Sequence, residues 1–227
     1  MKKYLLVLVM ALISASVINA QESYKPGAGS FSLEVGFSPF AANGSAISLP
    51  SGSLTGIYSL NDAIAIRLGL GFSQTSASTD DKTNKIKGSY SETEFSITPG
   101  IVYSFAGTAK LTPYAGAEFL IGSTGSFGER ESNYGSNNSS KTTRTNMDLN
   151  GDRFGINTFG IGVFTGFNYY FAKNLYIGAE VGLGYTSVSL KDGEITQGTT
   201  ATKYENESTA SAIGFHATPT LRLGWAF

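Results

Sequence analysis

The side chains most able to do chemistry in this sequence stand at alternate positions within segments rich in glycine and other small residues. They are six acids and arginines and the only histidine: Glu34, Arg67, Glu94, Glu118, Glu180, Arg222 and His216. If these segments are strands of one closed sheet, the seven side chains share its inner face, where charges must be paired or hydrated. Such a cluster can be a polar plug that holds a narrow tube in shape, or a gated ion path; we favour the plug. Four Glu against two Arg leave a net charge of −2, so any residual conductance should prefer cations.

Enzymatic chemistry finds little support in the residue types. A nucleophile with a base, a pair of carboxylates or a metal would be required. With one histidine, metal clusters that use several are excluded, and the absence of cysteine excludes disulfides and a lipid on an N-terminal Cys. His216 stands two residues before Thr218, but we expect it to be a structural histidine of the interior. We therefore expect no catalytic residue, no cofactor and no metal.

The segment from Asp148 to Asp152 has the acidic spacing of the start of a calcium loop. A calcium loop needs glycine at its sixth position and Glu at its twelfth, and Arg153 and Phe159 stand there instead. We interpret the segment as a solvated loop with turn residues, with calcium binding as the alternative.

The elements that position the ionisable residues are strands, because polarity alternates with period two from residue 28 onward. Ile64, Ile66 and Leu68, for example, alternate with Ala65 and Arg67. Eight segments behave this way, at roughly 31–38, 53–60, 64–73, 94–105, 114–121, 159–171, 177–185 and 213–227. In the second segment the register is ambiguous, and we favour Leu54, Tyr58 and Leu60 on the apolar face.

The connections alternate in length. After the second, fourth and sixth segments they are short turns at 61–62, 106–110 and 172–174, whereas the others are long and polar, roughly 39–51, 74–90, 123–156 and 187–210. This rhythm predicts antiparallel neighbours whose ends lie in two environments, as in transmembrane barrels with periplasmic turns and extracellular loops. The third long connection is rich in Ser, Asn, Gly and Thr and should be mobile.

The two faces decide between a soluble and a membrane barrel. One face is nearly all apolar and uncharged, with aromatic residues gathered toward the strand ends, whereas the other combines glycine with large polar side chains. Glycine beside long polar residues suits a crowded interior, and strand glycine on a solvated surface only weakens the strand. We therefore predict an all-β fold, a closed eight-stranded antiparallel up-and-down transmembrane β-barrel; a soluble lipocalin-like barrel is the alternative.

The N-terminus has the features of an export signal. Lys2 and Lys3 precede an apolar run at 4–13 and a plausible cleavage site after Ala20. A retained membrane anchor is the alternative, although the run is short for a spanning helix. We predict a signal peptide at 1–20, a short segment at 21–27 and a barrel at 28–227. Without Lys2 and Lys3 the net charge is near −3, which gives no reason to expect nucleic acid as a partner.

The last seven residues, Leu221 to Phe227, end on an aromatic residue with apolar residues at alternate positions before it. This pattern resembles the C-terminal assembly signal of bacterial outer-membrane proteins, which implies recognition by the barrel-insertion machinery through Leu223, Gly224, Trp225 and Phe227. The alternative is an ordinary lipid-facing strand end.

Across residues 28–227 the chain resembles the small OmpA-type or OmpX-type outer-membrane barrels, often described as porin-family β-barrel domains. The resemblance rests on the hairpin rhythm, the glycine-rich strands and the terminal Phe227. It implies a location in the bacterial outer membrane, lipid as a partner and a monomeric state. The chain departs from OmpA itself, which continues into a peptidoglycan-binding domain, so cell-wall anchoring is not carried over.

Three functions follow from these expectations. The first is a non-enzymatic role, structural or in surface interaction, with the long loops contacting an external ligand. The second is a narrow channel for ions or small solutes. The third is a lipid-modifying enzyme: outer-membrane lipid A deacylases resemble this architecture and use Ser, His and an acid, whereas Thr218 stands here in place of Ser.

Overall fold

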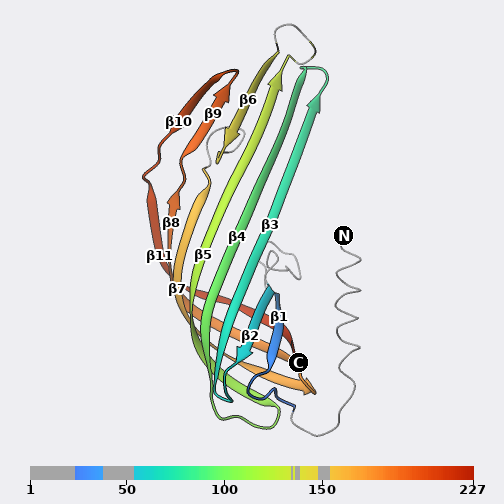
Figure 1. The fold of residues 1–227 in the computed structure, drawn as a ribbon, viewed down its shortest axis with the longest axis vertical. Helices are drawn as coiled ribbons and strands as arrows, with labels where there is room; N and C mark the ends of the chain where they lie inside the picture. Colours follow the sequence, from blue (N-terminus) through green and yellow to red (C-terminus); the bar gives the residue numbers. More distant parts are fainter. Residues whose placement is uncertain (1–23, 38–53, 134, 136–138, 148–153) are drawn as a thin grey trace.

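The computed structural model describes residues 24–37, 54–133, 135, 139–147 and 154–227, with the backbone alone for residues 37 and 214–220. Its described part is built from strands (Figure 1). These are β1 (Phe31–Phe37), β2 (Leu54–Ser59), β3 (Ile64–Asp81), β4 (Ile86–Ser104), β5 (Leu111–Ser132), β6 (Ser140–Thr145), β7 (Ile156–Ala172), β8 (Leu175–Leu190), β9 (Gly193–Gln197), β10 (Thr200–Tyr204) and β11 (Thr209–Ala226). The described residues include no helix long and apolar enough to cross a membrane.

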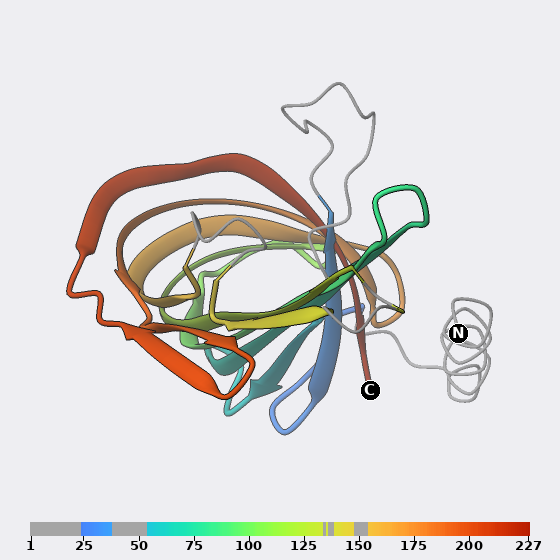
Figure 2. The same ribbon diagram turned by 90° about the horizontal axis from the view of Figure 1, so that it is seen from above.

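Eight of the strands close into a ring. Antiparallel pairings run from β1 through β2, β3, β4, β5, β7, β8 and β11, and β11 pairs with β1 again. At the closing pair Ser32 is opposite Ala226 and Glu34 is opposite Gly224. Figure 2 shows the ring from above. The predicted closed eight-stranded antiparallel barrel is confirmed.

Short turns connect the ring strands at one end, which we call the turn side. In the turn between β2 and β3, the Asn61 side-chain oxygen accepts hydrogen bonds from the backbone N–H groups of Ala63 and Ile64, at 2.9 and 2.8 Å. In the turn between β7 and β8, Asn174 adopts a φ of 61°, a left-handed conformation that asparagine tolerates. The three turns lie where the sequence predicted them.

The opposite end, which we call the hairpin side, differs from the expectation of long loops. β3 continues to Asp81 and β4 begins at Ile86, so the segment predicted as the loop 74–90 is mostly a hairpin. The segments 123–156 and 187–210 contain the end of β5 and the strands β6, β9 and β10, which prolong the wall in the order β5, β6, β9, β10 (Figure 1). Ser and Thr occupy both faces there, so no apolar alternation marked these strands in the sequence.

The polarity of the ring is inside-out. Large apolar side chains of the ring face outward and are exposed, for example Val163 at 56 % and Ile101 at 52 %, whereas Glu34 and Arg222 are buried inside. In β2, Leu54, Tyr58 and the adjoining Leu60 are exposed while Ile57 is buried, which confirms the register favoured for this strand. A small apolar cluster inside the barrel comprises Ile57, Ala65, Val102, Tyr114 and Phe164. The predicted orientation of the two faces is therefore confirmed.

Candidate functional site

The deepest buried ion pair in the barrel interior joins β1 and β11. Glu34 is 1 % exposed, and Nη1 of Arg222 lies 2.8 Å from its Oε2. The hydroxyl of Tyr176, from β8, donates a 2.7 Å hydrogen bond to the other carboxylate oxygen, Oε1. Removing charges from water is costly unless they are paired and hydrogen-bonded, and both oxygens of this carboxylate have partners.

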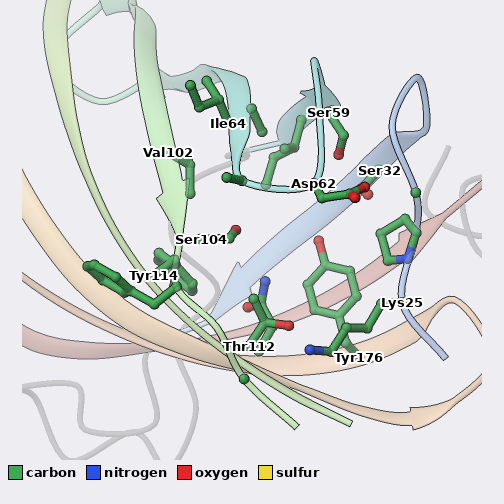
Figure 3. Close-up of a pocket in the computed structure, with 18 of the residues that line it drawn as sticks. Lys25, Ser32, Ser59, Asp62, Ile64, Val102, Ser104, Thr112, Tyr114 and Tyr176 are labelled. Atoms are coloured by element: carbon green, nitrogen blue, oxygen red, sulfur yellow. The ribbon is translucent and has the colours of Figure 1, made fainter. Parts of the chain in front are cut away.

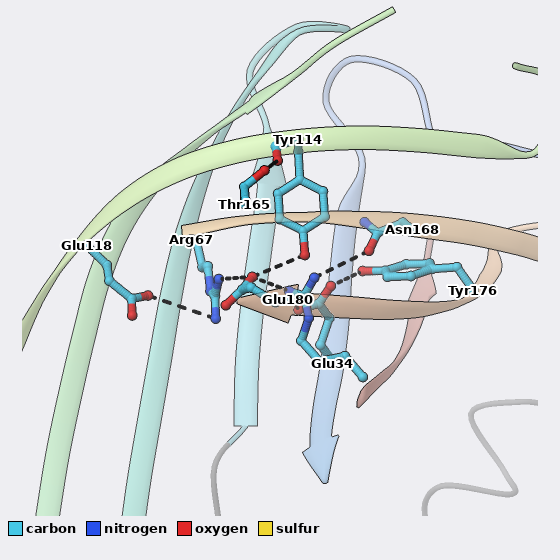
Figure 4. Close-up of polar contacts among 9 residues, drawn as sticks. Glu34, Arg67, Tyr114, Glu118, Thr165, Asn168, Tyr176 and Glu180 are labelled. Carbon is cyan, nitrogen blue, oxygen red and sulfur yellow. Dashed lines mark hydrogen bonds and ion pairs between the residues drawn. The ribbon is translucent and has the colours of Figure 1, made fainter. Parts of the chain in front are cut away.

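Glu180, on β8, connects this pair to a second arginine (Figure 4). Its Oε2 lies 2.8 Å from Nη1 of Arg67 and 3.3 Å from Nη1 of Arg222, and it accepts a 3.1 Å hydrogen bond from the Tyr114 hydroxyl. Charges of alternating sign therefore cross the lumen from Glu34 to Arg67. We call these four residues, Glu34, Arg222, Glu180 and Arg67, the plug.

Glu118 lies at the edge of the plug toward the hairpin side. Its Oε2 is 3.9 Å from Nη2 of Arg67, has no hydrogen-bond partner, and belongs to a side chain that is 28 % exposed. With Glu118 included, three carboxylates face two guanidiniums, so the cluster carries one excess negative charge.

Aromatic rings fill the space around the two arginines. The guanidinium of Arg67 lies 4.6 Å from the ring centre of Phe164, and that of Arg222 lies 5.1 Å from the ring centre of Tyr114. The rings of Tyr114 and Phe164 also meet edge to face, with their centres 6.2 Å apart, which is within the range of about 4.5–7 Å typical of aromatic pairs. Guanidinium groups bind well over aromatic faces, so the rings stabilise the charges as well as excluding water.

Glycines on neighbouring strands make room for these rings. A Cβ on Gly224 would collide with the ring of Tyr176, one on Gly116 with the ring of Phe164, and one on Gly166 with the ring of Tyr114. The glycine-rich inner face predicted from the sequence thus has a specific use at these three positions, where it admits large side chains into a narrow lumen.

A cavity of about 420 Å³ lies between the plug and the turn side (Figure 3). Ser32, Ser104, Thr112 and Tyr176 line it, together with the apolar Val102. The cavity adjoins the plug, because Arg222 of the plug and Tyr176, which donates to Glu34, both line it.

The segment Lys25 to Gly27 borders this cavity on the turn side. The ammonium of Lys25 donates a 3.1 Å hydrogen bond to the carbonyl oxygen of Leu111, and the backbone N–H of Asn174 donates one of 3.1 Å to the carbonyl oxygen of Tyr24. Nζ of Lys110 lies 4.5 Å from the ring centre of Tyr24. Burial lowers the pKa of Lys25 below its ordinary value, because the charged form loses water.

The predicted network residues are thus only partly brought together. Glu34, Arg67, Glu118, Glu180 and Arg222 meet, whereas Glu94 is exposed and accepts a 3.4 Å hydrogen bond from Ser73. The backbone of His216 is opposite Gly182, and its side chain lies outside the described residues.

Three residues of the site were not singled out from the sequence. Tyr176, Phe164 and Asn168 all point inward; Asn168 accepts a 3.4 Å hydrogen bond from Nη2 of Arg222. The alternation of faces along a strand could have found two of them. Tyr176 precedes the outward Ile177 and Phe164 follows the outward Val163, so both must face inward. The sequence analysis assigned neither Phe164 nor Tyr176 to a face, and Tyr176 precedes the segment predicted at 177–185.

The C-terminal residues predicted as an assembly signal form the end of β11. Leu223 and Phe227 are exposed and Trp225 is half-buried, with the ring centres of Trp225 and Phe227 5.0 Å apart. Phe227 and Phe31 exchange two backbone hydrogen bonds, of 2.8 and 3.0 Å, at the seam of the ring. Their recognition by insertion machinery stays a prediction.

Within the described residues, no group of three or more His, Cys, Asp or Glu is placed to hold a metal ion. The segment Asp148 to Asp152, considered above as a calcium loop, lies outside the described residues. The predicted signal peptide at 1–20 also lies outside them.

Comparison with known proteins gives similarity in structure only. No family model matches the chain, and no curated protein matches it in sequence. Among solved structures, the N-terminal β-barrel domain of Pseudomonas aeruginosa OprF is 16 % identical, with a TM-score of 0.37 over 89 % of this chain and all of that one. The outer membrane protein OprG of Pseudomonas aeruginosa is 14 % identical, with a TM-score of 0.43 over 91 % and 99 % of the two chains. The attachment invasion locus protein Ail of Yersinia pestis is 16 % identical, with a TM-score of 0.33 over 89 % of this chain and all of that one.

Proposed function

We propose that this chain is an outer-membrane β-barrel with a closed interior, whose role is to present the wall on its hairpin side to partners outside the cell. The observation that carries the proposal is the combination of an apolar exterior with a buried, ion-paired plug across the lumen. The turn side then faces the periplasm, where the turns of such barrels are short.

The exterior supports the membrane part of this proposal. Water does not favour a continuous band of outward Phe, Leu, Ile and Val, whereas hydrocarbon does, and a closed ring leaves no unpaired strand edge in lipid. A Lys placed at mid-depth on this face would cost about 2–4 kcal/mol.

The plug supports a structural barrel over an open pore. The side chains of Arg222, Glu180 and Arg67 are 5, 13 and 11 % exposed, so little water reaches the paired charges. Opening a path would require these pairs to separate, and breaking a buried pair by removing one partner costs about 3–5 kcal/mol.

The hairpin side supports a role in presentation. β3, β4 and β5 continue beyond the apolar part of the barrel, and β6, β9 and β10 add to the same sheet. A hydrogen-bonded sheet holds its exposed side chains in fixed positions, which lowers the entropic cost of binding a partner. This rigidity supports a role as an adhesin or as another protein that binds a partner at the cell surface.

A narrow cation path is the second candidate. It is favoured by the polar cavity of about 420 Å³ on one side of the plug and by the partly exposed Glu118 on the other. The excess negative charge of the cluster would attract cations. Planar-bilayer recording separates the two functions: a closed barrel gives no steady conductance, whereas steady cation-selective conductance establishes the channel.

The membrane barrel itself is tested by expressing the full chain and fractionating the envelope. The protein should be found with the outer membrane, and its unboiled and boiled forms should migrate differently on a detergent gel because the closed barrel resists unfolding. A protein that remains soluble in the periplasm and migrates identically in both forms would contradict the proposal.

A further inference from the structure

The outward face of the barrel changes character abruptly toward the hairpin side. On six successive ring strands, an outward apolar residue is followed, at the next outward position toward the hairpin side, by an uncharged polar residue. On β5 one further outward apolar residue, Phe127, lies beyond the polar one. The apolar residues are Phe72, Phe95, Ile121, Phe159, Tyr185 and Ile213. We call the polar ones the polar band: Gln74, Thr93, Ser123, Asn157, Ser187 and Ser211.

The register makes the polar band continuous across the six strands, with two steps. Phe72 is opposite Phe95, but Phe95 is opposite Ser123. The boundary between apolar and polar residues therefore lies one outward residue farther from the hairpin side on β5 than on β4. The boundary shifts by one more outward residue, in the same direction, between β7 and β8, where Phe159 is opposite Ser187. Strands tilted in a barrel cross a flat interface in such steps. The polar band therefore marks the level at which hydrocarbon gives way to headgroups.

One lysine lies at this level on the outer surface. Lys191 follows β8, and its ammonium donates a 2.7 Å hydrogen bond to Oγ of Ser123 on β5, so the side chain crosses the start of β7. A Cβ on Gly155 would lie 3.2 Å from Cδ of Lys191, and one on Gly125 would lie 3.8 Å from its Nζ. The two glycines thus leave a track along which Lys191 lies flat against the barrel wall.

Neutral polar groups surround the ammonium. Ser123 is directly opposite Asn157, which faces outward and is exposed. The side-chain oxygen of Asn146 lies 3.3 Å from the position that a Cβ would take on either glycine. No carboxylate of the residues that the structure describes forms an ion pair with Lys191.

We propose that Lys191, Ser123, Asn146 and Asn157 bind a phosphate of a phosphorylated saccharide headgroup, carried by a glycolipid of the outer leaflet. The inference rests on the proposed orientation of the barrel in the outer membrane. A lysine ammonium binds phosphate as a point charge, and hydroxyl and amide groups bind sugar hydroxyls. Phe95 lies beside Ser123 on β4, and Phe159 lies one outward position below Asn157 on β7. Both face outward, where the acyl chains of the same lipid would lie.

The test measures lipid that remains bound to the purified full-length barrel. Wild type, Lys191→Gln and the control Lys203→Gln are refolded in detergent micelles with bisphosphorylated lipid A or with its dephosphorylated form, and bound lipid is counted by native mass spectrometry. Lys203 is a suitable control because it is exposed on β10, at a distance in the sheet from the polar band.

We expect Lys191→Gln to retain about fivefold less bisphosphorylated lipid A than wild type or Lys203→Gln, as about 1 kcal/mol per surface lysine implies. Retention of the dephosphorylated form should be equal in all three proteins. Equal retention of both lipids by all three proteins, or equal losses in both variants, would overturn the inference. Detergent gels of the same samples separate the two proposals, because a chain that never shows a folded band contradicts the barrel itself.

Discussion

Tyr176 and Glu34, 142 positions apart, are joined by a 2.7 Å hydrogen bond in which the tyrosine hydroxyl donates to the buried carboxylate. They belong to β8 and β1, which are separated in the ring by β11. The contact therefore passes β11 on its lumen side. It links β1 to β8 through side chains, in addition to the backbone pairing of each strand with β11.

Tyr176→Phe removes this donor and leaves Oε1 of Glu34 buried without its partner. An unsatisfied buried group costs about 1–3 kcal/mol, so the free energy of unfolding should fall by that amount. Reversible urea unfolding in lipid vesicles, followed by gel shift, measures it. Tyr58→Phe, on the outer face, should change it by less than about 0.5 kcal/mol; equal effects of the two variants would argue against a structural plug.

Gly224→Ala should be destabilising even though alanine is small. The added Cβ would collide with the ring of Tyr176, and a shift of that ring would disturb its hydrogen bond to Glu34. Overpacking of this kind costs about 1–3 kcal/mol. Gly27→Ala is the matched control, because no atom lies within 4 Å of its Cβ position. Unchanged stability of Gly224→Ala in the same unfolding assay would contradict the tight packing around Tyr176.

Val163→Lys should reduce the stability of the inserted barrel by about 2–4 kcal/mol, because the side chain lies on the outward face at mid-depth. Ser89→Lys, exposed on the hairpin side beyond the polar band, should be tolerated. The fraction of folded protein after vesicle insertion reports both changes. Equal tolerance of the two lysines would mean that Val163 does not face hydrocarbon.

Arg67→Ala should turn the closed barrel into a leaky one. The substitution removes one cation beside Glu180 and Glu118 and exposes their carboxylates to the lumen. We expect new conductance with cation preference in planar bilayers, and a smaller preference when Glu118→Gln is combined with it. Should Arg67→Ala be too unstable to insert, the Glu118→Gln variant alone must leave the closed state unchanged. Anion preference in either variant would refute the assignment of charges.

Asp81 provides a pH-dependent contact at the hairpin between β3 and β4. The backbone N–H and side-chain amide of Asn84 and the backbone N–H of Thr83 donate to its carboxylate, which lowers the pKa of Asp81 below its ordinary value. Because the pKa of Asp81 is lower in the folded than in the unfolded protein, its ionised carboxylate stabilises the fold at pH above the unfolded-state pKa. This stabilisation is lost as the pH falls through the folded-state pKa. NMR titration should show the low pKa, and Asn84→Ala should raise it; an unchanged pKa in that variant would contradict these bonds.

The ring strands could be predicted because each has one lipid-facing side, which imposes period two on residues such as Ile64, Ile66 and Leu68. β6, β9 and β10 were missed because neither of their faces is apolar. Phe164 and Tyr176 were missed because parity was not followed through these two positions, although in this lumen rings fill the space that glycine leaves.

Contacts between distant strands depend on register and could not be predicted. The polar band needs the exact pairing of six strands, and the contact between Lys191 and Ser123 joins residues 68 positions apart. The departure of Glu94 from the network has the same origin. It stands six residues from Gly100 along β4, and Gly100 is the residue opposite Glu118, so the two carboxylates lie at different depths.

The central claim is that adjacent side chains of one strand face hydrocarbon and lumen in turn, and β4 tests it most directly. The sequence contains no cysteine, so Phe95, Ser96, Ile97 and Thr98 can each be replaced by a single cysteine and spin-labelled in lipid vesicles. The account predicts high accessibility to oxygen, which concentrates in hydrocarbon, at positions 95 and 97, and low accessibility at 96 and 98. High oxygen accessibility at 96 and 98 with shielding at 95 and 97 would contradict it.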